Sequence, residues 1–415
     1  MNEAQKRVVV VGAGAAGMMA AGIAAAGGAR VDLLERNAEV GRKLRLSGKG
    51  RCNLTNETDI DGLLANIPGN PKFLRTAFYR FTTQDAMAFF AARGVAVKTE
   101  RGGRVFPESD RADDVVESLI GFCRDGDVAF RTGVRVQKLL VNDGRIRGVQ
   151  LEGAQFPADA VILATGGLSY PGTGSTGDGY RLAQEVGHTI VPTRPSLAPL
   201  ETVEHWPSEA QGLSLRNVTL TVLSPTGKKI HHELGELLFT HFGVSGPLAL
   251  TASRHIDDQP ASGRSTLVID LKPGLTEEAL DARILRDLTK YHRREFFNAL
   301  DDLLPRSLIP IIIHQAEIPP ATWAHDVTRA QRLRLTHLLK HLTLTVKKIR
   351  PIAEAIITAG GVNTREIDPR TLQSRLLPGL YFAGELIDVD AYTGGFNLQI
   401  AWSIGHLAGE SVVVA

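Results

Sequence analysis

The feature that most constrains the fold is a run of four valines followed at once by GAGAAG, residues 12–17. An apolar strand that leads into Gly-x-Gly-x-x-Gly and then into a helix is typical of a dinucleotide-binding βαβ unit. Gly12 permits the sharp turn, Gly14 lets backbone approach a pyrophosphate, and Gly17 lets helix and strand pack closely. The pyrophosphate then lies over free N–H groups at the positive end of the helix. These residues predict a dinucleotide site.

A second apolar run, VDLLE, ends in Glu35, whose carboxylate can accept hydrogen bonds from a ribose diol. A signal peptide or membrane anchor is the competing interpretation of residues 8–29, because they carry no charge and follow Lys6 and Arg7. Six glycines interrupt this stretch, however, and it contains no leucine. Since the acid-tipped strand follows at once, the sequence favours a nucleotide-binding unit of a soluble protein.

The composition is that of an ordinary globular protein. A chain of 415 residues is long enough for two or three domains. Lys and Arg total 47 against 45 for Asp and Glu, so the net charge of +2 favours neither a nucleic acid nor a membrane as partner. Because the chain has two cysteines, no Cys-x-x-Cys and no close Cys/His cluster, we expect a cytoplasmic protein without a disulfide framework or a metal site.

The order of apolar patterns predicts one sheet domain that is interrupted by an insertion. We expect helices over 71–93 and 113–123, a short strand through Val134 and Val136, and buried strands in RIRGVQLEG and ADAVILATGG. Short alternating strands such as LRNVTLTVL then predict a β subdomain. A helical part follows, with core positions expected at Leu333, Leu335, Leu338, Leu339 and Leu342.

The nucleotide-binding pattern resumes near residue 345 with AIITAGGV, LYFAGELID and a final helix. We therefore predict a nucleotide-binding domain in two segments, 1–192 and 345–415, around an insert at 193–344. The insert has a β part at about 193–272 and a helical part at about 275–344.

Two carboxyl-terminal segments favour a flavin as the cofactor. The strand in LYFAGELID runs into Gly384 and Glu385, which places backbone amides and an acid beside a bound cofactor. Gly395 permits a close approach, and Asn397 is the expected N-cap of the final helix. A helix amino end near a flavin pyrimidine stabilises negative charge on the reduced ring, which a nicotinamide does not need. The alternative for these residues alone is a glycine turn before a packing helix.

ATGG at 164–167 follows a buried strand and is expected to lie beside the dinucleotide. GTGSTG at 172–177 is formally a second Gly-x-Gly-x-x-Gly segment. A proline-containing loop separates it from the strand, and no acid-tipped strand follows it. We therefore predict a loop that caps the helix DGYRLAQEVG, with no second nucleotide site visible.

Five basic residues fall within ten positions: Arg42, Lys43, Arg45, Lys49 and Arg51. They form either a solvated loop or the charge compensation for a pyrophosphate or an incoming phosphorylated nicotinamide. Nearby Ser47, Gly48, Gly50 and Asn53 offer small donors and exposed amides, whereas Cys52 is expected to pack without redox activity.

One histidine, His241 in FTHFGVSGP, is a candidate active-site acid or substrate contact. A structural role is the alternative for it. The basic and histidine residues between Arg332 and Arg350 are interpreted as the polar face of a helix. No catalytic acid or base is assigned with more weight than His241.

With these segments in order, the chain resembles the FAD-dependent oxidoreductases of the aminoacetone-oxidase-like or BaiN-like family. The resemblance covers nearly the whole chain and includes GAGAAG, GRKLRLSGKGRCNLTN, ATGG, FTHFGVSGP, ITAGGV and GELIDVDAYTGGFNLQIAW. It implies an α/β fold, in which a glutathione-reductase-like FAD-binding Rossmann domain is interrupted by a β-barrel-plus-helical insert. Lys49 departs from the pattern, which has glycine there more often.

By match of motif, the resemblance implies roles for individual residues in binding FAD. The ADP half would be bound by Gly12, Gly14, Gly17 and Glu35, and adenine would contact the backbone of Val136. The pyrophosphate and isoalloxazine would lie along Ser47, Gly48, Cys52 and Asn53. The ribityl chain and flavin ring would meet Gly384, Asp388, Asn397 and Leu398. The expected cofactor contacts also include Ala15, Ala16, Arg36, Lys43, Gly50, Ala164, Thr165, Gly166, Glu385 and Gly395.

We therefore expect hydride transfer between flavin N5 and a small organic substrate held under the insert, with NAD(P)H reducing the flavin. Family members are associated with reduction of conjugated bile-acid enones and with oxidation of aminoacetone, so substrate and direction stay open. The alternatives are an O₂-using amine oxidase of the aminoacetone-oxidase type and a non-catalytic flavin-binding redox sensor. A flavin-dependent RNA-modifying enzyme is disfavoured by the balanced charge.

Overall fold

The computed structural model describes residues 5–256 and 263–414. The chain divides into two compact units: unit 1 runs to Ser196 and resumes at Ile352, and unit 2 is Leu197–Pro351. Unit 1 contains a parallel sheet with helices, and unit 2 contains a closed β-barrel with helices. The predicted fold class is therefore confirmed.

Unit 1 is built on a five-stranded parallel sheet in the order β19-β10-β1-β2-β6. Its strands are β1 (Arg7–Val11), β2 (Arg30–Leu34), β6 (Ala129–Arg131), β10 (Ala160–Leu163) and β19 (Leu380–Phe382). Val8–Val11 and all of β10 are buried, as expected of central parallel strands that are covered on both faces. The parallel register brings the carboxyl ends of β1, β2, β10 and β19 to one edge, where a ligand of such a sheet binds.

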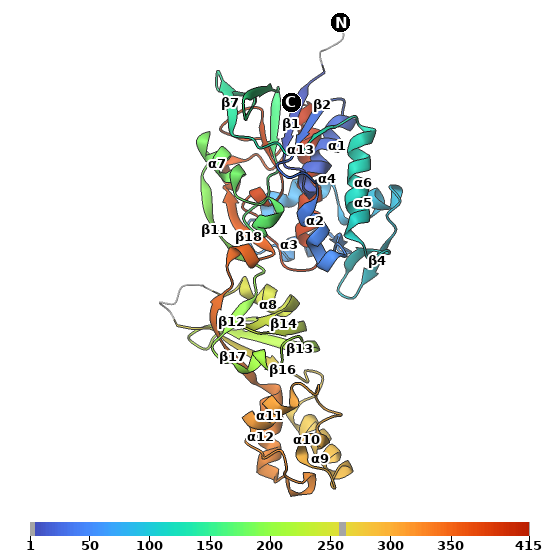
Figure 1. Ribbon diagram of the computed structural model, residues 1–415, viewed down its shortest axis with the longest axis vertical. Coiled ribbons are helices and arrows are strands. Elements are labelled where there is room, and N and C mark those ends of the chain that lie inside the picture. The colour runs from blue at the N-terminus through green and yellow to red at the C-terminus, as the bar shows by residue number, and fades with distance from the viewer. Residues whose placement is uncertain (1–4, 257–262, 415) are drawn as a thin grey trace. The chain divides into compact units, whose positions relative to one another are not determined.

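Helix α1 (Ala15–Ala26) packs against α13 (Phe396–Val414), and the two run close together beside the sheet (Figure 1). Two glycines of α13 explain how closely they approach. A Cβ on Gly405 would lie 2.6 Å from the carbonyl oxygen of Ala16, and one on Gly409 would lie 2.6 Å from that of Ala20. The amino- and carboxyl-terminal parts of the chain are thus held together by direct contact between helix backbones.

The other elements of unit 1 surround this centre. The helices are α2 (Arg42–Leu46), α3 (Ile60–Ala65), α4 (Arg75–Arg80), α5 (Thr83–Ala92), α6 (Ala112–Asp125) and α7 (Asp178–Glu185). The small antiparallel sheets are β3-β5-β4 (Thr55–Asn56, Arg104–Pro107, Val97–Glu100), β7-β8-β9 (Lys138–Asn142, Arg145–Leu151, Ala154–Pro157) and β11-β18 (Ile190–Ser196, Ile357–Val362). The helices expected over 71–93 and 113–123 are confirmed, the first being divided at Phe81 between α4 and α5.

The predicted strand through Val134 and Val136 is wrong. Both residues lie in the connection between β6 and β7, which has no strand geometry. The Val134 N–H donates to the carbonyl of Glu35 at 2.9 Å, and the Val136 side chain is buried. The alternating valines therefore belong to a segment that is hydrogen-bonded to the residue after β2. They do not indicate a strand of a sheet here.

Unit 2 contains a closed six-stranded barrel in the order β12-β15-β14-β13-β16-β17. Its strands are β12 (Leu200–Thr202), β13 (Ser214–Leu223), β14 (Lys229–Thr240), β15 (Gly243–Ser245), β16 (Thr266–Asp270) and β17 (Leu342–Ile349). Its helices are α8 (Gly246–Ser253), α9 (Glu277–Lys290), α10 (Phe296–Ala299), α11 (Ile309–Ala316) and α12 (Arg329–Lys340). The strand expected in LRNVTLTVL is β13.

The predicted core positions of the helical part are correct except at one residue. Leu335 and Leu339 of α12 are fully buried, and Leu342 is buried at the start of β17. Leu338 is partly buried, whereas Leu333 is 45% exposed. Leu333 lies on the outer side of α12 because it is two residues from Leu335, a spacing that a helix does not bring to one face.

No helix in the described part of the chain has both the length and the apolar character needed to cross a bilayer. The uncharged stretch near the amino terminus forms β1 and the 12-residue α1 instead.

Candidate functional site

The turn after β1 has the tight backbone packing that a dinucleotide motif requires. Gly12 has a positive φ of 105°, and a Cβ there would lie 2.5 Å from the carbonyl oxygen of Ala164. A Cβ on Gly17 would lie 1.8 Å from the carbonyl oxygen of Gly12. Because both obstacles are backbone atoms, no side chain larger than hydrogen fits at either position. The turn is thus pressed between α1 and the end of β10.

Gly14 is different, because open space lies beside it. Its φ is −88°, which any residue adopts, and a Cβ there would meet nothing within 4 Å. Gly14 is also the N-cap residue of α1 and offers no side chain to the first-turn amides, which lack intrahelical acceptors. Since α1 has no acidic residue in its first turn, its positive end is available to an anion. This arrangement fits a pyrophosphate.

Glu35 lies at the end of β2 with its side chain held in place. One carboxylate oxygen accepts a hydrogen bond from the Ala13 N–H at 2.9 Å, and the other accepts from the N–H and the side-chain amide of Asn37 at 2.9 and 2.7 Å. An ionised carboxylate accepts about four hydrogen bonds, so it keeps capacity for a ribose hydroxyl. Glu35 is 9% exposed. Its position directly after the strand is the one that the sequence predicts.

The segment after α2 forms a tight turn with left-handed residues. Gly48, Lys49, Gly50 and Cys52 all have positive φ, and Gly50 has open space beside it. The Cys52 N–H donates to the Ser47 carbonyl, while the Ser47 hydroxyl donates to the Leu44 carbonyl. The Cys52 side chain is fully buried, which raises its thiol pKa to about 12. A thiol with this pKa stays protonated at neutral pH, in keeping with the packing role that the sequence predicts.

Asn53 connects this turn to the amino end of α13. In the amide orientation that satisfies both of its ends, Oδ1 accepts from the Gly395 N–H at 2.9 Å and Nδ2 donates to the Thr55 carbonyl at 3.2 Å. Gly395 has a φ of 97°, and a Cβ there would lie 2.2 Å from the same Thr55 oxygen. The amino-terminal and carboxyl-terminal motifs therefore meet at backbone distance within unit 1.

The five basic residues of this region do not form a single patch. Arg45 pairs with Asp113 and Glu117, and Arg51 pairs with Glu100 and Asp110. Arg42 donates to the Asn37 side chain, and Lys49 is exposed. Since both paired arginines are neutralised by carboxylates, a joint role of the cluster in compensating a pyrophosphate is not supported by its geometry.

Lys43, the fifth of them, belongs to a network that the sequence did not reveal. Its ammonium donates to Glu385 Oε2 at 2.6 Å and to the Ser169 hydroxyl at 2.6 Å. Glu385 Oε1 accepts from the Ser169 hydroxyl and from the Thr358 N–H, each at 2.8 Å. Four segments far apart in the chain are thereby connected. Ser169 lies two residues after ATGG and Thr358 lies within ITAGGV, but nothing in their spacing indicates this contact.

Asn397 is not the N-cap of the final helix, so that prediction is wrong. Helix α13 begins at Phe396, and Asn397 is its second residue. The Asn397 side chain binds both backbone groups of Ala391, with Oδ1 accepting from its N–H at 3.0 Å and Nδ2 donating to its carbonyl at 2.8 Å. It thus holds the preceding loop against the helix. Leu398 packs partly buried against the core of unit 1.

The remaining predicted contacts lie at the same edge of the sheet or follow it. Gly384 has a φ of 81° and begins a short 3₁₀ turn, Gly384–Leu386, directly after β19. The backbone carbonyl of Asp388, two residues beyond that turn, accepts from the Asn70 side chain at 2.8 Å. Beside β10, Ala164 is buried and Gly166 has a φ of 72°. The Thr165 hydroxyl is buried and has no hydrogen-bond partner among the residues that the structure describes.

GTGSTG forms a loop that leads into α7 at Asp178, as predicted. Arg36 reaches it and donates to the Thr176 hydroxyl and, at 3.0 Å, to Asp178. The pKa of Asp178 is held below its usual value, chiefly by a hydrogen bond from Arg135. Arg36 is therefore engaged with this loop.

His241 is exposed in the turn between β14 and β15 of unit 2. Its ring meets Phe242 edge-on, with centroids 4.9 Å apart. Among the residues that the structure describes, no carboxylate or hydroxyl group is hydrogen-bonded to the His241 ring.

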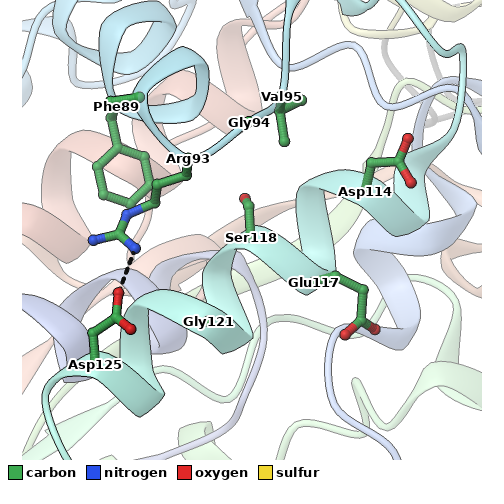
Figure 2. A pocket seen from close by; sticks show the side chains of 10 residues that line it. Phe89, Arg93, Gly94, Val95, Asp114, Glu117, Ser118, Gly121 and Asp125 are labelled. Atoms are coloured by element: carbon green, nitrogen blue, oxygen red, sulfur yellow. Dashed lines mark hydrogen bonds and ion pairs between the residues drawn. The ribbon is translucent and has the colours of Figure 1, made fainter.

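A surface hollow of about 810 Å³ lies between α5 and α6 in unit 1. Figure 2 shows Asp114, Glu117 and Ser118 along α6, with Arg93 pointing toward Asp125. The Arg93 guanidinium donates to Asp125 at 2.9 Å. Three carboxylates line this hollow and none of the predicted cofactor residues does, so it does not suit an anionic dinucleotide.

Comparison with known proteins identifies the family. The model of the HI0933-like protein Rossmann domain matches residues 6–411. The chain belongs to this family. The 3-dehydro-bile acid delta(4,6)-reductase of Clostridium scindens is 36% identical over 98% of each chain. The ribosomal RNA dihydrouridine synthases of Escherichia coli and Haemophilus influenzae are each 32% identical, over 98% and 97% of this chain and 98% of theirs.

Solved structures agree with the HI0933-like assignment at the level of the fold. A 3-ketosteroid delta1-dehydrogenase from Sterolibacterium denitrificans has a TM-score of 0.53 at 13% identity, covering 99% of this chain and 100% of its own. A 3-ketosteroid-delta4-(5alpha)-dehydrogenase from Rhodococcus jostii has a TM-score of 0.50 at 16% identity, covering 100% and 98%. The chain is a flavin-dependent oxidoreductase of the HI0933-like family, and this FAD-binding Rossmann family implies FAD as the cofactor. The resemblance noted from the sequence motifs is thus confirmed.

Proposed function

We propose that the chain is an NAD(P)H-dependent FAD enzyme that saturates a carbon–carbon double bond conjugated with a carbonyl group in a small organic substrate. The observation that carries the cofactor assignment is the open space beside Gly14 at the amino end of α1, with Glu35 fixed at the end of β2. The direction of the reaction is supported by the names of the relatives, which are a reductase and two dihydrouridine synthases.

These names describe one kind of chemistry on different substrates. Forming dihydrouridine from uridine saturates a double bond conjugated with a carbonyl of the pyrimidine. A bile-acid reductase that acts at positions 4 and 6 of a 3-dehydro compound removes double bonds conjugated with the 3-keto group. In both cases a hydride adds to the carbon at the end of the conjugated system, and a proton completes the product. This shared step favours reduction over amine oxidation.

Bound FAD supplies hydride at N5 of its isoalloxazine ring. The amino end of α1 would hold the pyrophosphate, Glu35 would accept from the adenosine ribose, and the backbone at Val136 would contact adenine. The flavin half would be held by two motifs that meet where Asn53 contacts Gly395. The amino-terminal motif would contribute Ser47, Gly48, Cys52 and Asn53. The carboxyl-terminal motif would contribute Gly384, Asp388, Asn397 and Leu398. The positive amino end of α13 would stabilise negative charge on the flavin pyrimidine.

The Lys43–Glu385 pair would orient the turn after β19 without contacting the substrate. Both carboxylate oxygens of Glu385 are already engaged by donors on other segments. Loss of the Glu385 side chain would therefore release the Ser169 and Thr358 segments together. The Cys52 thiol, being protonated at neutral pH, would contribute packing and no redox chemistry.

The second candidate function is reduction of a uridine in RNA. It is favoured by the two dihydrouridine synthases, which match this chain over nearly their full length. The net charge of +2 does not provide the strongly basic surface on which RNA binding usually depends. A small substrate is therefore our first proposal, and RNA is the substrate to be tested beside it.

The experiment is anaerobic reduction of the purified holoenzyme by NADPH and by NADH in turn, followed through the visible flavin absorption band. A small steroidal enone is then added to the reduced protein, and re-oxidation and the saturated product are measured. The same reduced protein is offered ribosomal RNA, and separately O₂. The Gly172→Ala variant, a substitution into open space, is assayed beside the wild type as a control that should leave every step unchanged.

We expect bleaching by one of the two nicotinamides and re-oxidation by the enone with formation of saturated product. Re-oxidation by RNA with dihydrouridine formation would move the assignment to the second candidate. Reduction by an amine with re-oxidation by O₂ alone would show an oxidase. Failure of both nicotinamides to bleach the flavin would contradict the proposed reductase.

A further inference from the structure

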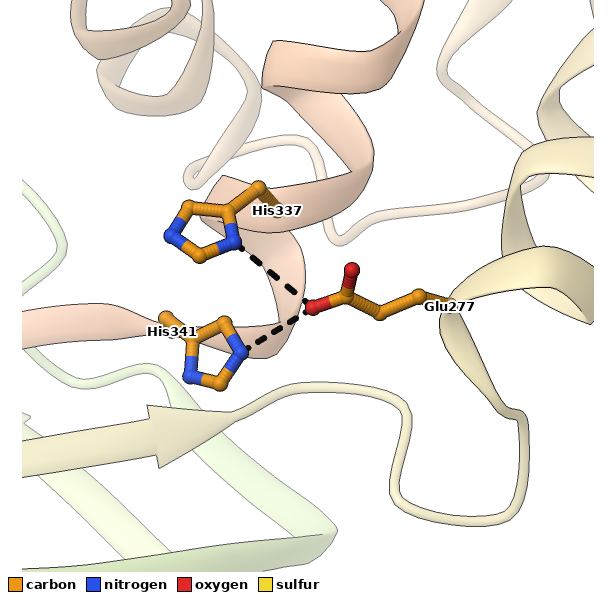
Figure 3. A group of neighbouring side chains, drawn as sticks. All are labelled: Glu277, His337 and His341. Atoms are coloured by element: carbon orange, nitrogen blue, oxygen red, sulfur yellow. Dashed lines mark hydrogen bonds and ion pairs between the residues drawn. The ribbon is translucent and has the colours of Figure 1, made fainter.

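Three exposed side chains of unit 2 come together where α9 begins and α12 ends, outside the segments expected to bind the cofactor. They are Glu277, the first residue of α9, His337 in the last turn of α12, and His341, which directly follows α12 (Figure 3). We propose that these three residues form a binding site for a divalent transition-metal ion of the Zn²⁺ class. The proposal does not depend on the redox reaction.

The distances between the candidate ligand atoms fit one metal ion. Glu277 Oε1 lies 3.1 Å from His341 Nε2 and 3.6 Å from His337 Nδ1, and all three atoms are within 4.8 Å of one another. Ligand atoms placed about 2.05 Å from a tetrahedral Zn²⁺ are about 3.4 Å apart. The two distances from Glu277 thus bracket the tetrahedral value, and the two imidazole nitrogens lie within 4.8 Å of each other.

The types of ligand select the class of ion. Two imidazole nitrogens and one carboxylate oxygen favour Zn²⁺, Co²⁺, Ni²⁺ or Cu²⁺ over Mg²⁺ and Ca²⁺, which take oxygen ligands. The three side chains are 47–68% exposed, so water can complete the coordination. Three protein ligands with an open position are also the number found at zinc sites that bind an exchangeable ligand.

The local structure explains why the ligands are held in place. His341 is the C-cap residue of α12, four residues after His337, and the two imidazole rings lie beside each other with centroids 4.5 Å apart and planes tilted by 38°. Thr276 caps α9 by accepting from the Ala279 N–H, which fixes the backbone beside Glu277. The Lys340 ammonium, between the histidines in sequence, is bound to Asp270 at 2.6 Å and to the Leu275 carbonyl at 2.6 Å. Asp270 therefore neutralises the charge of Lys340, and the ammonium is kept in place by Asp270 and the Leu275 carbonyl.

A bound ion would fasten the start of α9 to the end of α12. These helices already pack through buried Leu280, Leu335 and Leu339, so the three ligands need little ordering on binding. Sequence spacing does not reveal the site, because Glu277 is far from the histidine pair in the chain. The pair alone is explained equally well as part of a polar helix face.

The test is calorimetric titration of the holoenzyme, produced without a polyhistidine tag, with Zn²⁺. Titration with Co²⁺ adds a second readout, because tetrahedral coordination changes its visible spectrum. We expect one equivalent per chain. Affinity should fall about 10-fold or more in each of His337→Ala, His341→Ala and Glu277→Gln, since each removes one of three protein ligands. His325→Ala removes another exposed histidine of the same helical part and should leave the affinity unchanged.

Thermal unfolding provides an independent readout. Zn²⁺ in excess should raise the melting temperature of the wild type and of His325→Ala, but not that of His341→Ala. Because all three ligands are exposed, the variants should fold and retain flavin. Absence of saturable binding, or binding that survives the loss of both imidazoles, would overturn the proposal.

Discussion

The chain contains the pattern Gly-x-Gly-x-x-Gly twice, as GAGAAG at 12–17 and as GTGSTG at 172–177, and the two copies have different structures. In the first copy, the buried strand β1 runs straight into the turn and α1 leaves it at once. In the second, residues 164–171 separate β10 from the first glycine, and the loop reaches α7 without forming a βαβ unit.

The glycines of the two copies also differ in what surrounds them. In the first, Cβ atoms on Gly12 and Gly17 would meet backbone at 2.5 and 1.8 Å. In the second, Cβ atoms on Gly174 and Gly177 would meet the side chains of Asn37 and Leu168, and one on Gly172 would meet nothing within 4 Å. A side chain can move aside, whereas the backbone carbonyls of Gly12 and Ala164 are held in place at the ends of β1 and β10. Contact between backbones, more than the spacing of glycines, therefore distinguishes the first turn from the second.

The second copy nevertheless has a structural role, because a hydrogen bond and an ion pair connect it to the residues that follow Glu35. The Asn37 side chain, which binds Glu35, also donates to the Thr173 carbonyl at 2.9 Å, and Arg36 pairs with Asp178. The loop therefore braces the residues that follow the acid at the end of β2.

The largest effect is expected for Gly17→Ala. The added methyl group would lie 1.8 Å from the carbonyl oxygen of Gly12, so α1 must move away from the turn. Overpacking of this kind costs about 1–3 kcal/mol or more. We expect a protein that unfolds at lower temperature and is purified with little or no flavin. Retention of full flavin content and an unchanged melting temperature would contradict the backbone-contact explanation.

A somewhat smaller effect is expected for Gly405→Ala, which tests the same kind of contact between α13 and α1. Its Cβ would lie 2.6 Å from the Ala16 carbonyl, and separating the helices should cost about 1–3 kcal/mol in chemical denaturation. Gly121→Ala in α6 is the matched control, since nothing lies within 4 Å of its Cβ. That control should gain about 0.5–1 kcal/mol from helix propensity. Equal behaviour of the two variants would refute this interpretation.

Asp178→Asn should have a modest effect that depends on pH, because the ion pairs that brace the second glycine loop are lost. Arg135 holds the pKa of Asp178 below its usual value, so its contribution to the free energy of unfolding is fully present above the unfolded-state value of about 3.9. It is lost as the pH falls through the lower folded-state value. We expect a difference of about 1 kcal/mol or less from the wild type at pH 7, which vanishes at strongly acidic pH. A difference that persists there would show a cause other than charge.

The smallest effect is expected for Gly172→Ala. Its φ is not positive and its surroundings are open, so stability should change by about 0.5 kcal/mol or less, and flavin content should not change. Loss of flavin in this variant would mean that the second glycine segment contacts the cofactor after all.

The elements that are predicted correctly from the sequence are those in which one local pattern determines one local structure. The βαβ unit, the acid at Glu35, the strand in LRNVTLTVL and the helix over 113–123 each follow from periodicity within a short window. The return of the carboxyl-terminal segment to the first motif was also predicted. The contacts that achieve it, from Asn53 to Gly395 and from Gly405 to Ala16, require coordinates.

The predictions that were wrong involved residues whose partners are distant in sequence. Val134 looked like a strand residue because it is apolar, yet it is held by the Glu35 carbonyl. Asn397 looked like a helix cap, yet its amide binds Ala391. For the basic cluster the sequence leaves two interpretations open, and the ion pairs of Arg45 and Arg51 with carboxylates of α6 and of the β4–β5 region favour a solvated loop for these two residues. Side chains with several alternative partners cannot be assigned without knowing which partner is near.

The FAD-binding role of the first turn is tested most directly at Gly14, the one glycine of the first motif with open space beside it. Gly14→Val adds a side chain where the pyrophosphate would lie, and its backbone geometry suits any residue. The measurement is FAD released per chain on denaturation, together with the unfolding temperature of wild type and variant after both are stripped of flavin. We predict that the variant folds with nearly the stripped wild type's stability but retains almost no FAD. A variant that carries a full equivalent of FAD would contradict the assignment of this turn as the cofactor cradle.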